Sequence, residues 1–309
     1  MARAPPRPRD PLRASAPPDT VARVTTRPHD PTLTAACLAS RAAAALAVTP
    51  RPTTVDGLVA GDPGTLVRGV AVTTLATLEV LERAVAAGAN VVVTHEPPDY
   101  DHTGAAVPDL EAEGDPVLAA KRSFVADHGL VVWRAHDAWH DRRPDGVDEG
   151  TARALGWSLD PAADGASVCA VGPTTLGELA AHVATALGSR TARFVGDPEQ
   201  PVRRVGLDLG FRGFARNRAL LRRADVDAVV VGEAHEWETQ SYALDAAHLG
   251  ATGRGAPKGL VVAGHVPAEQ AGMELFADWL RDVVPEVPVT FLPAPDLARP
   301  ALPADRPAG

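Results

Sequence analysis

Histidine and carboxylate side chains gather at four places in this 309-residue chain, each directly after a run of apolar residues. The four segments are His95-Glu96, His136-x-x-x-His140-Asp141, Glu233-x-His235-Glu236 and His265-x-x-x-Glu269. Imidazole and carboxylate together form the mixed ligand set that Zn, Mn, Fe and Co prefer. Four such segments in one chain favour a metal site over four unrelated surface features.

The spacing of His265 and Glu269 predicts a joint role for these two side chains. An apolar run ends just before His265, and Pro267 suits the first turn of a helix. Residues four positions apart lie on the same side of a helix, so both side chains can reach one ion. Alternatively, Glu269 is a helix-start carboxylate favoured by the macrodipole, beside an incidental histidine.

His136 and His140 have the same spacing of four, which is typical of a helical metal pair. Trp139 and the flanking charges are also typical of an ordinary surface turn, so both interpretations stay open. His95 and Glu96 follow the most hydrophobic run of the chain, where a buried imidazole and carboxylate are costly unless paired or coordinated. His102 is close enough in sequence to reach the same site, or it is a histidine of a surface loop.

Other common chemistries lack their sequence signatures. The glycine-bearing turn 210–213 has neither GxGxxG nor Walker spacing, so a phosphate cradle is not supported. No GxSxG motif occurs, and Cys37 and Cys169 have no neighbouring base and no CxxC spacing. A covalent nucleophile is therefore not expected.

Strands alternate with helices around these segments, which predicts an α/β fold. An apolar strand, a helix and a second apolar strand at 90–94 precede His95, and the same order at 202–231 precedes Glu233. This likeness favours an internal repeat, although short apolar segments also agree by chance. Ligands of α/β proteins bind at the carboxyl ends of strands, so we expect the metal site there, between two lobes.

The domain organisation follows from composition. Residues 1–30 contain seven Pro and six Arg without apolar periodicity, and we expect a disordered arm. We expect a first lobe over 31–162, a second lobe over 163–292 and a loose Pro-rich tail over 293–309.

The net charge is −9, and the arm carries +3, so the remaining residues carry −12. Nucleic acid is an improbable partner for so acidic a body, because phosphate contacts need a basic surface. No stretch approaches the roughly 18 apolar residues of a membrane-spanning helix. Two cysteines are too few for a disulfide framework, so we expect a protein of the reducing cytoplasm.

Several ordered motifs between Thr53 and Leu292 resemble one known family. They are GVAVTTLATLEVLERAVAAGANVVVTHEPP, VVWRAHDAWHD, GEAHEWE and AGHVPAEQAGM. The chain is similar in these motifs to the Nif-three-like dinuclear-metal-centre hexameric proteins, whose members often carry the label GTP cyclohydrolase 1 type 2. The resemblance implies a two-lobed α/β subunit, a toroidal hexamer and two divalent ions per subunit, of Zn, Mn, Fe or Co.

The resemblance also implies site residues. Metal ligands of the family fall on His95, His265 and Glu269, whereas this chain has Glu96 and His140 where most members have a histidine and an aspartate. We interpret the two departures as an exchange within one ligand set, with Asp141 as the alternative to His140. His136 corresponds to a proton-handling group, and Glu233 and Glu236 fall in a segment near the cavity. We expect His136 and Glu236 to take part in catalysis.

Two classes of function fit these features. The first is a metal-dependent hydrolase acting on a small or nucleotide-like substrate. The second is a hexameric metal-binding scaffold or regulatory protein without catalysis.

Overall fold

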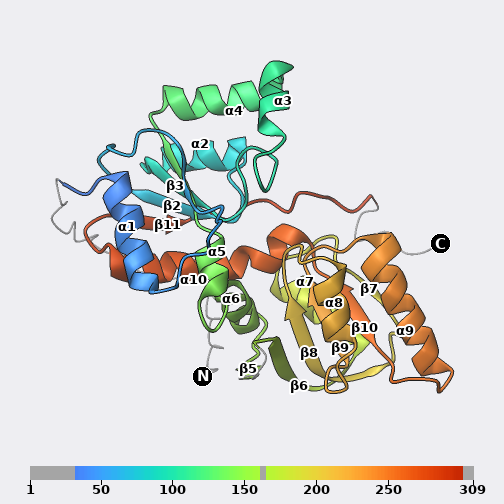
Figure 1. Ribbon diagram of the computed structural model, residues 1–309. Helices are drawn as coiled ribbons and strands as arrows, with labels where there is room; N and C mark the ends of the chain where they lie inside the picture. The colour runs from blue at the N-terminus through green and yellow to red at the C-terminus, as the bar shows by residue number, and fades with distance from the viewer. Residues whose placement is uncertain (1–31, 161–164, 302–309) are drawn as a thin grey trace, which may run out of the picture.

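The computed structural model describes residues 32–160 and 165–301, which form two mixed sheets with helices around them (Figure 1). The first sheet has the strand order β1 (Gly57–Ala60), β4 (Val131–Arg134), β3 (Val91–Thr94), β2 (Val70–Thr73) and β11 (Val289–Phe291). Its last four strands are parallel, and β1 is antiparallel to β4. The predicted α/β class is therefore confirmed.

Helices cover both faces of the first sheet. They are α1 (Ala35–Leu46), α2 (Leu78–Ala86), α3 (Val107–Ala112), α4 (Pro116–Asp127), α5 (Asp137–Asp141), α6 (Gly146–Ala154) and α10 (His265–Val283). Successive strand residues point to opposite faces, which explains why the central strands are apolar throughout. Val70 and Val72 pack into a core shared with α1 and α10, whereas Ala71 packs with α2 and α4 on the other face.

The second sheet has six strands. Their order is β5 (Leu159–Asp160), β6 (Ser167–Thr175), β8 (Pro201–Asp208), β9 (Ala228–Val231), β10 (Gly259–Val262) and β7 (Arg193–Val195). The accompanying helices are α7 (Leu176–Ala186), α8 (Phe214–Leu221), the π-helix η1 (Glu236–Gln240) and α9 (Ser241–Ala251). In the described parts of the chain, no helix combines the length and the apolar character that a membrane span requires.

One local topology occurs in both sheets. Parallel neighbours β2 and β3 are joined through α2, and parallel neighbours β8 and β9 are joined through α8. A third parallel strand follows each pair, β4 or β10, and an antiparallel edge strand closes that side, β1 or β7. The strand arrangement thus supports the predicted internal repeat.

Helix α10 returns the chain from the second sheet to the first (Figure 1). Strand β11 pairs with β2, with Val289 opposite Val70, and β5 pairs with β6 of the second sheet. Relative to the predicted lobes 31–162 and 163–292, residues 159–160 pair within the second sheet and residues 289–291 pair within the first. Apolar strand patterns do not specify a pairing partner, and only the path of α10 brings 289–291 to the first sheet.

The chain directly after β11 packs against both lobes over residues 293–296. Ala294 is buried, and Arg83 donates a hydrogen bond to the Pro293 carbonyl at 2.8 Å. Asp296 accepts a bond from the backbone N–H of Arg190 at 2.9 Å. Residues 293–296 of the predicted tail 293–309 thus contact other parts of the chain, while the predicted arm 1–30 and residues 302–309 lie outside the described residues.

Two glycines allow α6 and α10 to pack in backbone contact. A Cβ on Gly150 would lie 2.5 Å from the Ala271 carbonyl oxygen, and a Cβ on Gly272 would lie 2.5 Å from the Cα of Val147. Side chains at these positions would push the helices apart. Their close contact fixes the starts of both helices, where side chains of the candidate site lie.

Candidate metal centre

The predicted site residues leave the ends of parallel strands and meet between the two sheets. His95 and Glu96 follow β3, His136 follows the neighbouring strand β4, and His265 follows β10 of the other sheet. Nε2 of His265 lies 3.1 Å from Oε1 of Glu96, which joins the two lobes at this point. The location agrees with the rule that α/β proteins place ligands at carboxyl strand ends.

His95 and His140 face each other through their Nε2 atoms at 3.1 Å, and both rings are buried. Nδ1 of His95 donates to the Ala135 carbonyl at 3.2 Å, so its Nε2 carries a lone pair. Nδ1 of His140 lies 2.9 Å from the Asp145 carboxylate and 2.8 Å from the Arg212 guanidinium. A proton or a cation can lie between the two facing Nε2 atoms, and Zn–N bonds of roughly 2.0–2.1 Å fit this separation.

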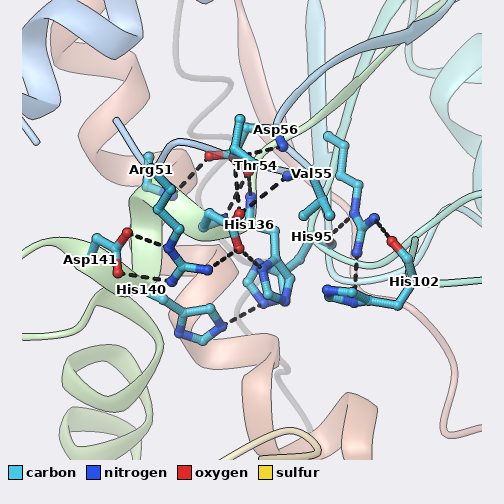
Figure 2. Close-up of polar contacts among 12 residues, drawn as sticks. Arg51, Thr54, Val55, Asp56, His95, His102, His136, His140 and Asp141 are labelled. Atoms are coloured by element: carbon cyan, nitrogen blue, oxygen red, sulfur yellow. Dashed lines mark hydrogen bonds and ion pairs between the residues drawn. The ribbon is translucent and has the colours of Figure 1, made fainter. Parts of the chain in front are cut away.

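His136 stacks on His95 at a ring distance of 4.4 Å, in the centre of the histidine group (Figure 2). Its Nδ1 lies 3.0 Å from Asp137, and Arg51 holds that carboxylate at 2.7 Å. Asp56, just before β1, accepts hydrogen bonds of 2.6 to 2.8 Å from the backbone N–H groups of 136–138. The loop before an edge strand thus caps α5 and fixes the position of both of its histidines.

Glu269 is the most buried carboxylate of the site, with 1% of its surface exposed. Its Oε2 lies 3.3 Å from Nε2 of His265 and 3.7 Å from Nε2 of His95. The i,i+4 relation with His265 confirms the spacing argument. This oxygen accepts no hydrogen bond from the described residues, and a buried oxygen without a partner is unusual.

Burial sets the charge state of the two inner histidines. Burial lowers the pKa of His95 to about 3, in spite of the nearby Glu269 carboxylate. Burial, with His140 and Arg134 beside it, lowers the pKa of His136 to about 2. Both imidazoles are therefore neutral at pH 7, which is the form that binds metals.

His265 has the opposite environment. Burial alone would lower its pKa, but Glu269, Glu233 and Glu96 together raise it above the ordinary value. Burial likewise opposes ionisation of Glu96, but the hydrogen bond from His265 prevails and lowers the Glu96 pKa to about 2. The carboxylates thus create a place for positive charge at Nε2 of His265, while Glu233 fixes Nδ1 as a donor at 3.2 Å.

These residues fit a divalent metal site. Two groups of three ligand atoms lie within 4.8 Å of one another, His95-His136-His140 and His95-Glu96-Glu269. The facing Nε2 atoms of His95 and His140 and the buried Oε2 of Glu269, which accepts no hydrogen bond from the described residues, offer ligand atoms in one enclosed place. The His and Glu clusters are therefore consistent with metal binding.

Two predicted residues lie outside the cluster. Glu236 begins η1 with an exposed side chain, and its carboxylate lies 3.6 Å from Arg193. Asp141 turns toward Arg51, which binds both of its oxygens at 2.6 and 2.8 Å (Figure 2). Of the two alternative ligands in this segment, His140 and Asp141, the structure brings His140 to the cluster.

Sequence reasoning missed several supporting residues. Asp145 caps α6 and also orients His140, and Arg134 donates to both the carbonyl and Nδ1 of His102. Gly210 lies so close to the cluster that a Cβ there would be 2.2 Å from Oε1 of Glu269. The Asp-Gly sequence at 145–146 and the glycines of turn 210–213 mark a cap and a turn, but no sequence signal connects them to a metal.

Comparisons with known proteins agree with this arrangement. The structure of the protein ybgI has a TM-score of 0.68 and 22% identity, covering 86% of this chain and 100% of that one. A hypothetical protein of Staphylococcus aureus, SA1388, has a TM-score of 0.67 and 17% identity over 85% and 97%. A Bacillus cereus protein related to NIF3 has a TM-score of 0.65 and 15% identity over 84% and 97%. These likenesses show a shared fold.

A comparison with curated protein sequences gives no match. The family model of DUF34/NIF3, named after NGG1p interacting factor 3, matches residues 53–296. This match covers most of the chain and confirms the family resemblance seen in the motifs. The chain belongs to the DUF34/NIF3 family.

Proposed function

We propose that this protein binds two divalent ions and hydrolyses a small or nucleotide-like substrate. The observation that carries the proposal is the pair of facing Nε2 atoms of His95 and His140 beside the buried Glu269 oxygen that accepts no hydrogen bond from the described residues. His95, His140 and Glu269 would hold one ion, and Glu96 and His265 would complete the site for the second. Two such ions would supply Lewis-acid chemistry, acidifying water and polarising a substrate oxygen.

In this proposal His136 handles the proton. Its Nδ1–H is directed at Asp137, so the lone pair of the neutral ring is on Nε2. That nitrogen lies 3.9 Å from Glu96, on the side of the cluster. The ring can accept a proton at Nε2 and return it to a leaving group, while Asp137 and Arg51 keep the ring in place.

We further propose assembly into a hexamer and residence in the cytoplasm. Leu244 and Leu249 on α9 are 60% and 41% exposed, which supports a subunit contact at this helix. Cys37 and Cys169 are both free, as expected in a reducing compartment.

Three measurements on the full chain test the proposal. Elemental analysis after loading with Zn, Mn, Fe or Co should give about two ions per chain, and light scattering should give a hexameric mass. A panel of nucleotides and phosphoesters should include a substrate that the loaded protein hydrolyses. His265→Ala should lose metal and activity, while His128→Ala, on the exposed end of α4, should keep both.

Each outcome has a definite meaning. Metal content near zero after every loading would refute the metal site, and a monomeric mass would refute the hexamer. Full metal content and a hexameric mass without hydrolysis of any panel member would favour the scaffold over the enzyme. His136→Gln should abolish hydrolysis and leave the metal count unchanged; a lower count would make His136 a ligand.

A further inference from the structure

A cavity of about 640 Å³ opens directly beside His265. Glu233, Phe211, His235 and Arg193 are among its other lining residues. Small-molecule sites in proteins typically have volumes of roughly 300–1,000 Å³. This cavity therefore has the size of a substrate site and touches the candidate metal centre.

Three aromatic rings form a continuous row, of which Phe211 and His235 line this cavity and Trp237 extends the row beyond the lining residues. Phe211 lies 4.9 Å from His235, and His235 stacks on Trp237 at 4.4 Å with an interplanar angle of 16°. Glu238 holds Nδ1 of His235 at 2.7 Å, so the middle ring is fixed. Phe211 is 46% exposed and Trp237 is 73% exposed, which is a large apolar exposure for side chains already in contact.

The backbone around the row is also unusual. Trp237 lies on the π-helix η1, and such segments occur frequently at functional sites. Phe211 lies in the turn 210–213, whose Gly210 touches Glu269 of the metal cluster. The same turn thus connects the aromatic row to the candidate ligands.

Two charged side chains, Glu233 and Arg193, line the cavity. One oxygen of the Glu233 carboxylate accepts a hydrogen bond from His265. The other oxygen can accept a further hydrogen bond from a ligand. Arg193 is 56% exposed in its side chain and lies 3.6 Å from Glu236, a weak surface pair that an anion can replace. A ligand ring with N–H groups could donate to Glu233, and an anionic group attached to that ring could pair with Arg193.

We propose that this cavity binds a planar ring of the nucleobase class, stacked on Phe211, with its N–H edge toward Glu233. Aromatic side chains accept any base as a stacking partner, and the carboxylate selects rings that carry hydrogen-bond donors. The inference rests on the proposed function, since it names the substrate class of the same site. The scissile part of the substrate then lies at His265 and Glu269.

Titration calorimetry with the full chain, both chelated and Zn-loaded, tests the ring site. The probes are the four ribonucleoside 5′-monophosphates, with ribose 5-phosphate as the matched compound without a ring. Nucleotides should bind in a saturable way, and ribose 5-phosphate should bind at least about 10-fold more weakly, given the usual contribution of one stacked base. Emission of the exposed Trp237 should change on nucleotide binding.

Variants separate stacking from other causes. Phe211→Ala should weaken nucleotide binding about 10-fold or more, and Phe211→Leu should fail to restore it, because leucine fills space without a π face. Tyr100→Ala, which removes an exposed aromatic ring of the first lobe, should change nothing. Glu233→Gln should reduce the preference among the four bases.

Equal binding of ribose 5-phosphate and nucleotides, or no binding of either, would overturn the inference. It would also fall if Phe211→Ala and Trp237→Ala altered the assembled mass and left nucleotide binding intact, because the row would then be a subunit contact. Hydrolysis is measured in a separate assay from nucleotide binding. Nucleotide binding without hydrolysis refutes only the proposed enzyme, and hydrolysis of ring-free esters without nucleotide binding refutes only the ring site.

Discussion

Replacing Gly210 by alanine should damage the metal centre from a position that supplies no ligand. Gly210 has a φ of +72°, and its Cβ would lie 2.2 Å from Oε1 of Glu269 and 3.7 Å from Nε2 of His265. Glu269 is 1% exposed, so its carboxylate is enclosed by the protein. Either the turn or the carboxylate must move.

The expected magnitude has two parts. An alanine in left-handed backbone costs roughly 1 kcal/mol of unfolding free energy. Forcing extra volume into a packed site costs typically about 1–3 kcal/mol more. Displacement of Glu269 should also weaken metal binding by about 10-fold or more, as loss of a well-placed group around a metal commonly does.

Gly213→Ala is the matched control. Gly213 has a φ of +80°, and nothing lies within 4 Å of its Cβ position, so this variant meets only the backbone cost. Urea unfolding of the chelated proteins gives the stability difference, and calorimetric Zn titration gives the affinity difference. Equal Zn affinity of the two variants would refute the close coupling between turn 210–213 and Glu269.

Three other predictions concern separate parts of the protein. Glu96→His and His140→Asp should each weaken metal binding, and the double variant should recover about 1 kcal/mol relative to their sum; strict additivity in calorimetry would contradict a shared centre. Burial, together with Asp145, raises the pKa of Asp148 to about 7, so the folded state holds an extra proton above the unfolded pKa of about 4. Stability therefore falls as pH rises from about 4 toward 7, and Asp148→Asn should flatten this decline in urea unfolding at pH 5 and 8. Removal of residues 1–30 should leave melting temperature and metal content unchanged, and a drop of more than a few degrees would show that the arm packs on the body.

Local features of the fold could be predicted from the sequence because local periodicity encodes them. The apolar run that ends the segment 202–231 forms β9 over 228–231, and Thr175 and Glu178, spaced as a capping box requires, form one at the start of α7. The contact of His265 with Glu269 also follows from spacing alone, since both lie on the first turns of α10.

Contacts between distant segments could not be predicted in this way. The predicted helical pair is only partly helical, because His136 is the N-cap of α5 and depends on Asp56 from the loop before β1. Arg51 binds Asp141, and this pairing turns the carboxylate away from the cluster. Each of these contacts joins residues about 80 to 90 positions apart, so no short window contains both partners.

The sequence by itself determined which residue types follow each buried strand, and hence that histidines and carboxylates would end up at strand ends. Only the tertiary structure decided which of them meet. Helix α10 crosses between the sheets and brings His265 to Glu96, 169 positions earlier in the chain, while the equally promising Glu236 faces outward. The physical reason is that strand ends are set by local hydrophobic pattern, whereas the approach of two sheets depends on packing of α6 on α10 at Gly150 and Gly272.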